Sequence, residues 1–282
     1  GFLGARRDRT ATSQWTTLAA SADADTLPDL DVLRSRSRDL VRNDPIAASA
    51  IQTKVVNVIG PGHQVRPDID AERLGLDAEA KRAWENEALD IWQDWAASRD
   101  CDITRTLTFG ELEDLVYRSC LLSGDVLVVR RFRRRPGRLL GTCLQVVEAD
   151  RLSNPDHRAD TPRLAGGIEM DADGAPIAYH IANRHAFDVS QAGSREWRRV
   201  PAFTRSGRRI VLHLHGTRHR PDMTRYAPML APVIESLKQR SRYSEAELMA
   251  AVVSACFAVG MKSSEGDLGG LLPEASASDN AS

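Results

Sequence analysis

The fold is decided by the stretch Tyr226–Val259, whose sequence is YAPMLAPVIESLKQRSRYSEAELMAAVVSACFAV. It contains no glycine, both of its prolines lie near its start, and Gly260 follows its last apolar residue. Proline is tolerated in the first turn of a helix, and glycine is favoured just after the last turn. The stretch therefore predicts one long helix, about 44 Å from Ala231 to Val259 at about 1.5 Å per residue.

Polarity along this helix is uneven. Residues 238–247 are almost wholly polar, whereas Leu248–Val259 is apolar on nearly every side. The apolar end is shorter than the roughly 20 residues that cross a bilayer, so we expect no membrane partner. Either this end is buried in its own domain, or it contacts another subunit. The candidate subunit interface consists of Leu248, Met249, Val252, Val253, Cys256 and Phe257.

The composition indicates a globular chain. Of its 282 residues, 42% are hydrophobic and 27% are charged, and the formal net charge is −1. This even balance argues against binding nucleic acid over the whole surface, so any DNA contact has to be local. The four cysteines (Cys101, Cys120, Cys143 and Cys256) form no CxxC pair, which favours buried thiols over a disulfide framework. The arginine-rich N-terminus lacks the apolar core of a signal peptide.

The N-terminal part is predicted to be helical after a flexible arm at residues 1–27. Asp29 or Asp31 can cap a helix that runs to Arg42, and Pro45 begins a second helix that ends at Ile59. The arginines of the first helix fan around it, which favours a solvated basic surface over a strip that binds phosphates. They are Arg34, Arg36, Arg38 and Arg42.

Two more helices are expected before residue 125. Asp77–Ala97 carries Trp84, Trp92 and Trp95, which we expect to bury a large area and fix the helix in a core. A platform for stacking nucleic-acid bases is the alternative. Thr108 with Glu111 three residues later forms a capping box for a helix that ends at Gly124.

From Asp125 the pattern becomes that of strands. Residues 126–132 and 142–148 predict a hairpin, and further strands are expected at 167–170, 177–182, 197–201 and 210–215. Residues 28–222 are thus predicted to form one α+β domain. The hairpin tip is either a solvated loop or a contact for DNA phosphates or an acidic protein surface. Its arginines are Arg130, Arg131, Arg133, Arg134, Arg135 and Arg138.

One cluster has the composition of a metal site. His213 and His215 lie at alternate positions of a predicted strand and so point the same way, and His219 follows. This cluster supports an alternative function, a metal-dependent DNA-processing enzyme. Neighbouring arginines oppose a divalent cation, and the chain has no HExxH, P-loop or GxSxG motif. We therefore expect no catalytic residues, no metal and no cofactor.

Three ordered blocks carry a resemblance to a known family. They are Arg34–Ile51 with Asn57–Gly60, then Phe109 through Leu127, then Met223–Lys238 continuing to Ala251. In this order they resemble the portal proteins of lambda-like tailed phages, over about Arg6 to Lys262. The resemblance implies a portal-like fold, in which residues 28–222 form the wing, 223–260 a stem helix, and 261–282 the start of a clip or a flexible tail.

The resemblance also implies a function. Portal proteins form a ring, dodecameric in the mature particle, at one vertex of the phage head, and double-stranded DNA passes through it. The implied partners are the terminase motor, the major capsid or scaffold protein and head-tail connector proteins. The implied locations are the virion and, during assembly, the host cytoplasm. Since the family continues with a second stem helix and a crown, the resemblance predicts a truncated product that self-associates without forming a uniform ring.

Overall fold

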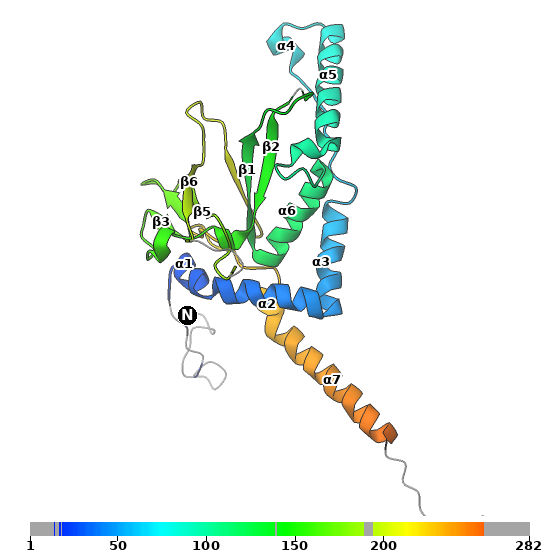
Figure 1. Cartoon of the computed structure of the whole chain (residues 1–282), viewed down its shortest axis with the longest axis vertical. Helices are drawn as coiled ribbons and strands as arrows, with labels where there is room; N and C mark the ends of the chain where they lie inside the picture. The colour runs from blue at the N-terminus through cyan, green and yellow to red at the C-terminus, as the bar shows by residue number, and fades with distance from the viewer. Residues whose placement is uncertain (1–13, 15–16, 18, 139, 189–193, 257–282) are drawn as a thin grey trace, which may run out of the picture. The chain divides into compact units, whose positions relative to one another are not determined.

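The computed structural model describes residues 14, 17, 19–138, 140–188 and 194–256, and the chain divides into two compact units, Gly1–Leu237 and Lys238–Ser282. The first unit combines helices with two antiparallel sheets, which confirms the α+β class (Figure 1). Its helices are α1 (Ala22–Thr26), α2 (Leu30–Asn43), α3 (Pro45–Val58), α4 (Ala71–Leu74), α5 (Ala78–Ala97) and α6 (Phe109–Ser123).

Local capping explains where these helices begin. The Asp44 carboxylate accepts hydrogen bonds from the backbone N–H groups of Ile46 and Ala47, so the chain ends α2 and begins α3 at Pro45. The predicted capping box of Thr108 and Glu111 is present at the start of α6. In contrast, the arm predicted for residues 1–27 is wrong at its end, because Ser21 caps α1. Residues 1–13 lie outside the described part.

The strands form two sheets. One has the order β2-β1-β7, from β1 (Asp125–Phe132), β2 (Thr142–Val147) and β7 (Val211–His215). The other has the order β3-β4-β5-β6, from β3 (Leu164–Ala165), β4 (Ile168–Met170), β5 (Pro176–Ala182) and β6 (Trp197–Pro201). The predicted hairpin is confirmed, with Phe132 paired to Thr142 and Leu127 to Val147.

The main core lies between the two sheets. Leu127 and Val129 of β1 are buried in one cluster with Tyr179 and Ile181 of β5 and with Val200 of β6. Val126 and Val128 point to the other face of β1 and are also buried, on a strand that contacts α6. Because side chains alternate along a strand, the apolar run in β1 fills both faces of its sheet.

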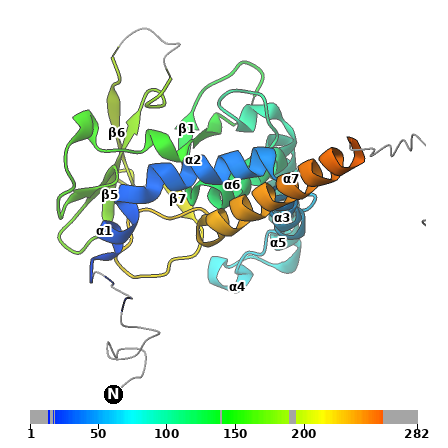
Figure 2. The same ribbon diagram turned by 90° about the horizontal axis from the view of Figure 1, so that it is seen from below.

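A second core joins the helices. Leu40 of α2, Ile51 of α3 and Leu121 of α6 pack together with Leu230, which lies much later in the chain. Figure 2 shows α2 lying across the lower end of the unit, with α1 at its N-terminal end. The C-terminal segment of the first unit is thus part of the helical core.

The long helix begins later than its sequence predicts. It comprises a 3-10 turn at Ala231–Val233 followed by α7 (Ile234–Cys256), so the prediction that Tyr226–Leu230 is helical is wrong. Tyr226 and Leu230 are instead buried in the first unit. Their path depends on Gly124, where φ is +88° and an added Cβ would lie 1.9 Å from the carbonyl oxygen of Tyr226. The chain therefore crosses the end of α6 in close contact before α7 starts.

The predicted end of this helix and the segment after it are not described. The structure follows α7 as far as Cys256. Residues 257–259, which the sequence assigns to the helix, and residues 261–282, predicted to begin a clip or form a tail, lie outside the described residues.

The tryptophans of α5 behave differently from one another. Trp92 and Trp95 pack with Phe109 of α6, with ring centroids 4.9 Å and 5.6 Å from it. Trp84, however, is half exposed, and none of the residues of α5 is fully buried. The prediction that all three rings fix the helix in a core is therefore right only for its C-terminal half.

Candidate nucleic-acid and subunit-contact surfaces

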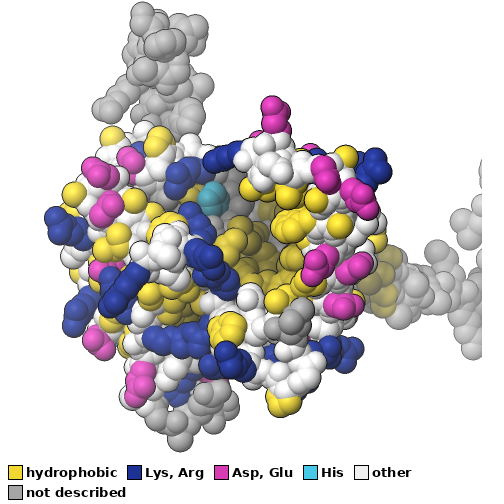
Figure 3. All heavy atoms as spheres, turned by 90° about the horizontal axis from the view of Figure 1, so that it is seen from above, with side chains coloured by type: hydrophobic (Ala, Val, Ile, Leu, Met, Phe, Trp, Pro, Cys, Tyr) yellow, Lys and Arg dark blue, Asp and Glu magenta, His cyan; other side chains and the backbone are white. Residues whose placement is uncertain are grey.

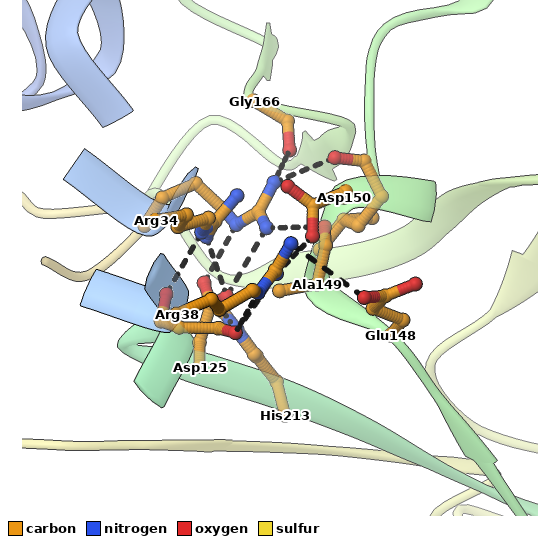
Figure 4. Close-up of polar contacts among 11 residues, drawn as sticks. Arg34, Arg38, Asp125, Glu148, Ala149, Asp150, Gly166 and His213 are labelled. Atoms are coloured by element: carbon orange, nitrogen blue, oxygen red, sulfur yellow. Dashed lines mark hydrogen bonds and ion pairs between the residues drawn. The ribbon is translucent and has the colours of Figure 1, made fainter. Parts of the chain in front are cut away.

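A buried polar group of the first unit is centred on Asp125, the first residue of β1. Its Oδ1 accepts hydrogen bonds from Arg34 Nη2 at 2.7 Å and from Arg225 Nη2 at 3.1 Å. Its Oδ2 accepts from Arg225 Nε at 2.6 Å and lies 3.1 Å from His213 Nε2 (Figure 4). Segments that are distant in sequence therefore meet at one buried carboxylate.

The two arginines are also satisfied by backbone oxygens. Arg34 Nε donates to the carbonyl oxygen of Ser123 at 2.8 Å, and Arg225 donates to those of Ala149, Leu152 and Gly166 at 2.6–2.8 Å. Hydrogen bonds from charged groups to buried carbonyls stabilise both partners. This arrangement fixes the end of α6 and the turn before β4 against the segment that leads to α7.

Burial and the neighbouring charges together set the pKa values in this group. Burial would raise the pKa of Asp125, but the positive charges of Arg225 and Arg34 and the hydrogen bond from His213 hold it far below its usual range. Burial lowers the pKa of Arg34 to about 10, and the charge of Arg225 adds to this effect. Burial also lowers the pKa of His213, although the hydrogen bond to Asp125 opposes the change.

Sequence reasoning missed this group because it assigned Arg34 to a solvated surface. Arg34 is 2% exposed, so that prediction is wrong, while Arg36 and Arg42 are exposed as predicted. Arg38 is intermediate: it forms ion pairs with Asp150 and with Glu148. The partner of Arg34 lies 91 residues later in the chain, and the local sequence pattern does not indicate that the Arg34 side chain is buried.

The structure separates the histidines that the sequence groups together. His213 and His215 do share one face of β7, with ring centroids 6.0 Å apart. However, His213 is held by Asp125, and His215 stacks on Tyr226 at 3.8 Å with nearly parallel rings. His219 is exposed in the following loop. Within the described residues no three His, Cys, Asp or Glu side chains are placed to hold a metal ion.

The arginines of the hairpin fall into two groups. Arg135 and Arg138 both bind Asp100, through Arg135 Nη1 at 3.1 Å and Arg138 Nε at 2.5 Å from its carboxylate oxygens. Arg105 binds the same carboxylate at 3.0 Å. Asp100 is 6% exposed, so these arginines anchor the base of the loop rather than project freely from it.

The other arginines of the hairpin are available for contact. Arg133 and Arg134 are exposed, and Arg130 and Arg131 are half-buried. Burial and the nearby charges of Arg198 and Arg133 lower the pKa of Arg131, so positive charges are crowded here. Seen from above, Lys and Arg side chains gather at the left and lower rim of a hollow lined by hydrophobic side chains (Figure 3).

The candidate subunit interface lies on α7, within the second unit. The side chains of Leu248, Met249, Val252 and Val253 are 47–66% exposed. Cys256 ends α7, and Phe257 lies outside the described residues. Isolated exposed apolar residues are ordinary on protein surfaces, but four within six positions of one helix form a patch that association would cover.

Two further sequence predictions concern the state of the cysteines and membrane-spanning helices. Cys101, Cys120 and Cys143 are buried free thiols, as predicted, and burial raises the pKa of Cys120 to about 12. Among the described helices, none combines the length and the hydropathy that crossing a bilayer requires.

Comparison with known proteins assigns the chain to a family. Residues 8–279 match the description "Phage portal protein, lambda family". The chain is 26% identical to the portal protein of Escherichia phage N15 over 255 residues, which are 88% of this chain and 47% of that protein. It is also 26% identical to portal protein B of Escherichia phage lambda over 253 residues, 88% of this chain and 46% of that protein.

Solved structures give weaker similarity. A chain in the virion of a native gene transfer agent particle aligns with a TM-score of 0.43 at 15% identity, over 78% of this chain and 45% of that one. A chain in the neck of an empty gene transfer agent particle gives 0.41 at 16% identity, over 79% and 48%. The chain spans about half the length of the curated relatives that it matches. By the match to residues 8–279, this chain belongs to the lambda family of phage portal proteins.

Proposed function

We propose that this chain is a structural subunit of a portal ring, which forms the DNA conduit at the head vertex of a tailed phage and serves in DNA packaging, head assembly and head-tail joining. The family match supports this role. The single observation that carries the proposal is the exposed patch on α7, Leu248, Met249, Val252 and Val253. Fully burying an exposed apolar side chain of this size contributes about 1.5–3 kcal/mol, and each of these four, at 47–66% exposure, would contribute a part of that amount.

The proposed partners follow from the same role. The subunit associates with copies of itself, and the ring contacts the terminase motor, the major capsid or scaffold protein and the head-tail connector proteins. Double-stranded DNA passes through the ring, which is located in the virion and is assembled in the host cytoplasm. The role is structural and not catalytic. The hairpin arginines Arg130, Arg131, Arg133 and Arg134 are the proposed contacts to DNA or to an acidic partner surface.

Self-association provides the test. Light scattering of the wild-type chain over a range of concentrations should give a mass above that of the monomer, and the double variant Val252→Asp/Val253→Asp should be monomeric. The matched control Ser244→Asp/Ala246→Asp places the same two charges on exposed positions of the polar part of α7 and should associate as the wild type does. Near-ultraviolet circular dichroism should be the same for all three proteins.

Two outcomes would contradict the proposal. A wild-type chain that stays monomeric at every concentration would remove the basis for assembly through α7. Loss of the near-ultraviolet signal in Val252→Asp/Val253→Asp alone would mean that these valines belong to the core of the fold. Electron microscopy of the associated wild type distinguishes closed rings from open chains.

A further inference from the structure

A cavity of about 580 Å³ lies in the first unit beside the Asp125 group. Its walls come from α2, from residues 150–166, from residues 185–187 and from Arg195, and the buried Arg34 and Arg225 lie at its floor. This volume is within the range of about 300–1,000 Å³ that is typical of small-molecule sites. Neither the family match nor the proposed ring assembly gives this cavity a role.

The lining of the cavity is strongly basic. The arginines are Arg34, Arg38, Arg42, Arg158, Arg195 and Arg225, against the aspartates Asp31, Asp150 and Asp160. Arg34 and Arg225 share the carboxylate of Asp125 behind the floor, so these three buried side chains together carry one positive charge in excess. Both floor arginines are 2% exposed. A buried charge without a full counter-charge is costly, which favours a bound anion.

The carboxylates that line the cavity either have other partners in the protein or are exposed to solvent. Asp150 binds Arg38, and Asp160 accepts hydrogen bonds from Asn154 Nδ2 at 2.8 Å and from the N–H of Gly166 at 3.0 Å. Asp31 is exposed. These carboxylates therefore leave arginine donors of the cavity available to another acceptor.

Arg195 is one of these donors. Its Nη2 donates to two neutral oxygens, the carbonyl of Asp150 at 3.4 Å and Ser153 Oγ at 3.2 Å. Its guanidinium lies over the ring of Trp197, 4.8 Å from the centroid, and this contact keeps it in place against the wall. A positioned guanidinium loses less conformational freedom on binding an anion than a mobile one.

Two further arginines lie at the rim. The side chains of Arg42 and Arg158 are both 69% exposed, and their acidic neighbours Asp39 and Asp156 lie at 3.9 Å and 3.7 Å. Exposed ion pairs of this kind contribute little, so both guanidinium groups can turn toward a ligand. The planar fork of arginine matches the oxygens of phosphate.

We infer that this cavity binds a phosphate group, with Arg42, Arg158 and Arg195 as its donors and the buried pair Arg34 and Arg225 supplying positive charge from the floor. Phosphate satisfies the excess charge and offers several oxygens to donors on different walls. The site is formed within the first unit, so it does not depend on ring assembly.

Calorimetric titration of the full chain tests this inference with pyrophosphate as the probe, at an ionic strength kept constant with sodium chloride. Saturable binding is expected for the wild type. The variant Arg42→Gln/Arg158→Gln, which changes only exposed side chains, should bind at least tenfold more weakly. The control Arg82→Gln/Arg208→Gln removes two exposed arginines that do not line the cavity, and its affinity should equal that of the wild type.

The same titration identifies the source of the phosphate. If a short single-stranded DNA competes with pyrophosphate and its binding is also abolished in Arg42→Gln/Arg158→Gln, the site binds a nucleic-acid backbone. If DNA does not compete while inorganic phosphate does, the site binds a free phosphate compound. No saturable binding to the wild type, or equal weakening in the rim variant and the control, would overturn the inference.

Discussion

Arg225 binds Asp125 through two hydrogen bonds, Nε to Oδ2 at 2.6 Å and Nη2 to Oδ1 at 3.1 Å, between side chains that are 2% and 1% exposed. The pair connects the start of the central strand β1 to the segment that precedes α7. Since Arg225 lies in the same segment as Leu230, the pair holds in place a residue that completes the helical core.

Replacing Asp125 by Asn should lower the free energy of unfolding by about 3–5 kcal/mol, because two buried guanidinium groups would lose their counter-charge. Urea unfolding followed by circular dichroism measures the change. The control Asp39→Asn alters a half-exposed carboxylate on α2 and should cost less than about 0.5 kcal/mol. Equally small losses of stability in both variants would mean that the guanidinium groups of Arg34 and Arg225 remain compensated without the Asp125 charge.

The stability of the chain should fall as the pH drops below about 6.5. Burial lowers the pKa of His213 from 6.5, so the unfolded chain takes up a proton that the folded chain resists. The loss approaches about 1.4 kcal/mol per pH unit for one proton. Asp125, whose pKa is also lowered, adds its loss only below about pH 3.8, so the two groups act in separate ranges.

Urea unfolding at intervals between pH 7 and pH 5 checks this dependence. In His213→Gln, which keeps a donor for Asp125 but does not titrate, the curve should be flatter across this range. An equal slope in the wild type and the variant would assign the pH dependence to other groups.

Gly124→Ala should destabilise the fold more than Gly174→Ala does. Both glycines have positive φ, +88° and +81°, and this backbone strain costs an alanine about 1–3 kcal/mol. Only at Gly124 would the added Cβ meet other atoms, the Tyr226 carbonyl oxygen at 1.9 Å, whereas at Gly174 nothing lies within 4 Å. Thermal unfolding of both variants measures the difference, and equal shifts in Tm would contradict the close approach.

The two groups of hairpin arginines should respond differently to mutation. Arg133→Ala/Arg134→Ala should reduce the salt dependence of DNA binding, by about 0.9 in the logarithmic slope for each DNA phosphate that is no longer neutralised, and leave stability nearly unchanged. Arg135→Ala/Arg138→Ala should instead lower stability, by about 1–3 kcal/mol, because Asp100 is buried and would keep only Arg105 as an ionic partner. DNA titrations at several salt concentrations and urea unfolding measure both quantities. An unchanged salt slope in the first variant would make the loop tip a solvated surface.

Features that depend on near neighbours in sequence were predictable. The breaks at Asp44-Pro45 and Gly124 and the capping box at Thr108 involve contacts within four residues, and the structure has them at the predicted places. The hairpin and the later strands also follow from local sequence, namely short runs rich in apolar and β-branched residues that are separated by turn residues. What these runs do not predict is the division of the strands into two sheets, because that depends on which strand pairs with which.

The Asp125 group was not predictable for a different reason. An arginine on a helix is normally solvated, and burial of Arg34 becomes favourable because Asp125 and the carbonyl oxygen of Ser123 approach it. Trp84 shows the opposite case, since a large aromatic side chain predicts burial but this one stays half exposed on α5. In both cases the outcome depends on whether a distant segment of the chain packs against the side chain, which the local sequence does not indicate.

The distances along the chain in the Asp125 group set a limit on when the first unit can finish folding during translation. Arg34 precedes Asp125 by 91 residues, and Arg225 follows it by 100. At about 5–20 residues per second, the ribosome needs roughly 5–20 s after making Asp125 before it makes Arg225. During that interval the carboxylate lacks Arg225 as a partner, and the end of α6 at Gly124 is still without the Tyr226 segment that covers it. The first unit therefore completes its core late, when nearly all of its own sequence has been synthesised.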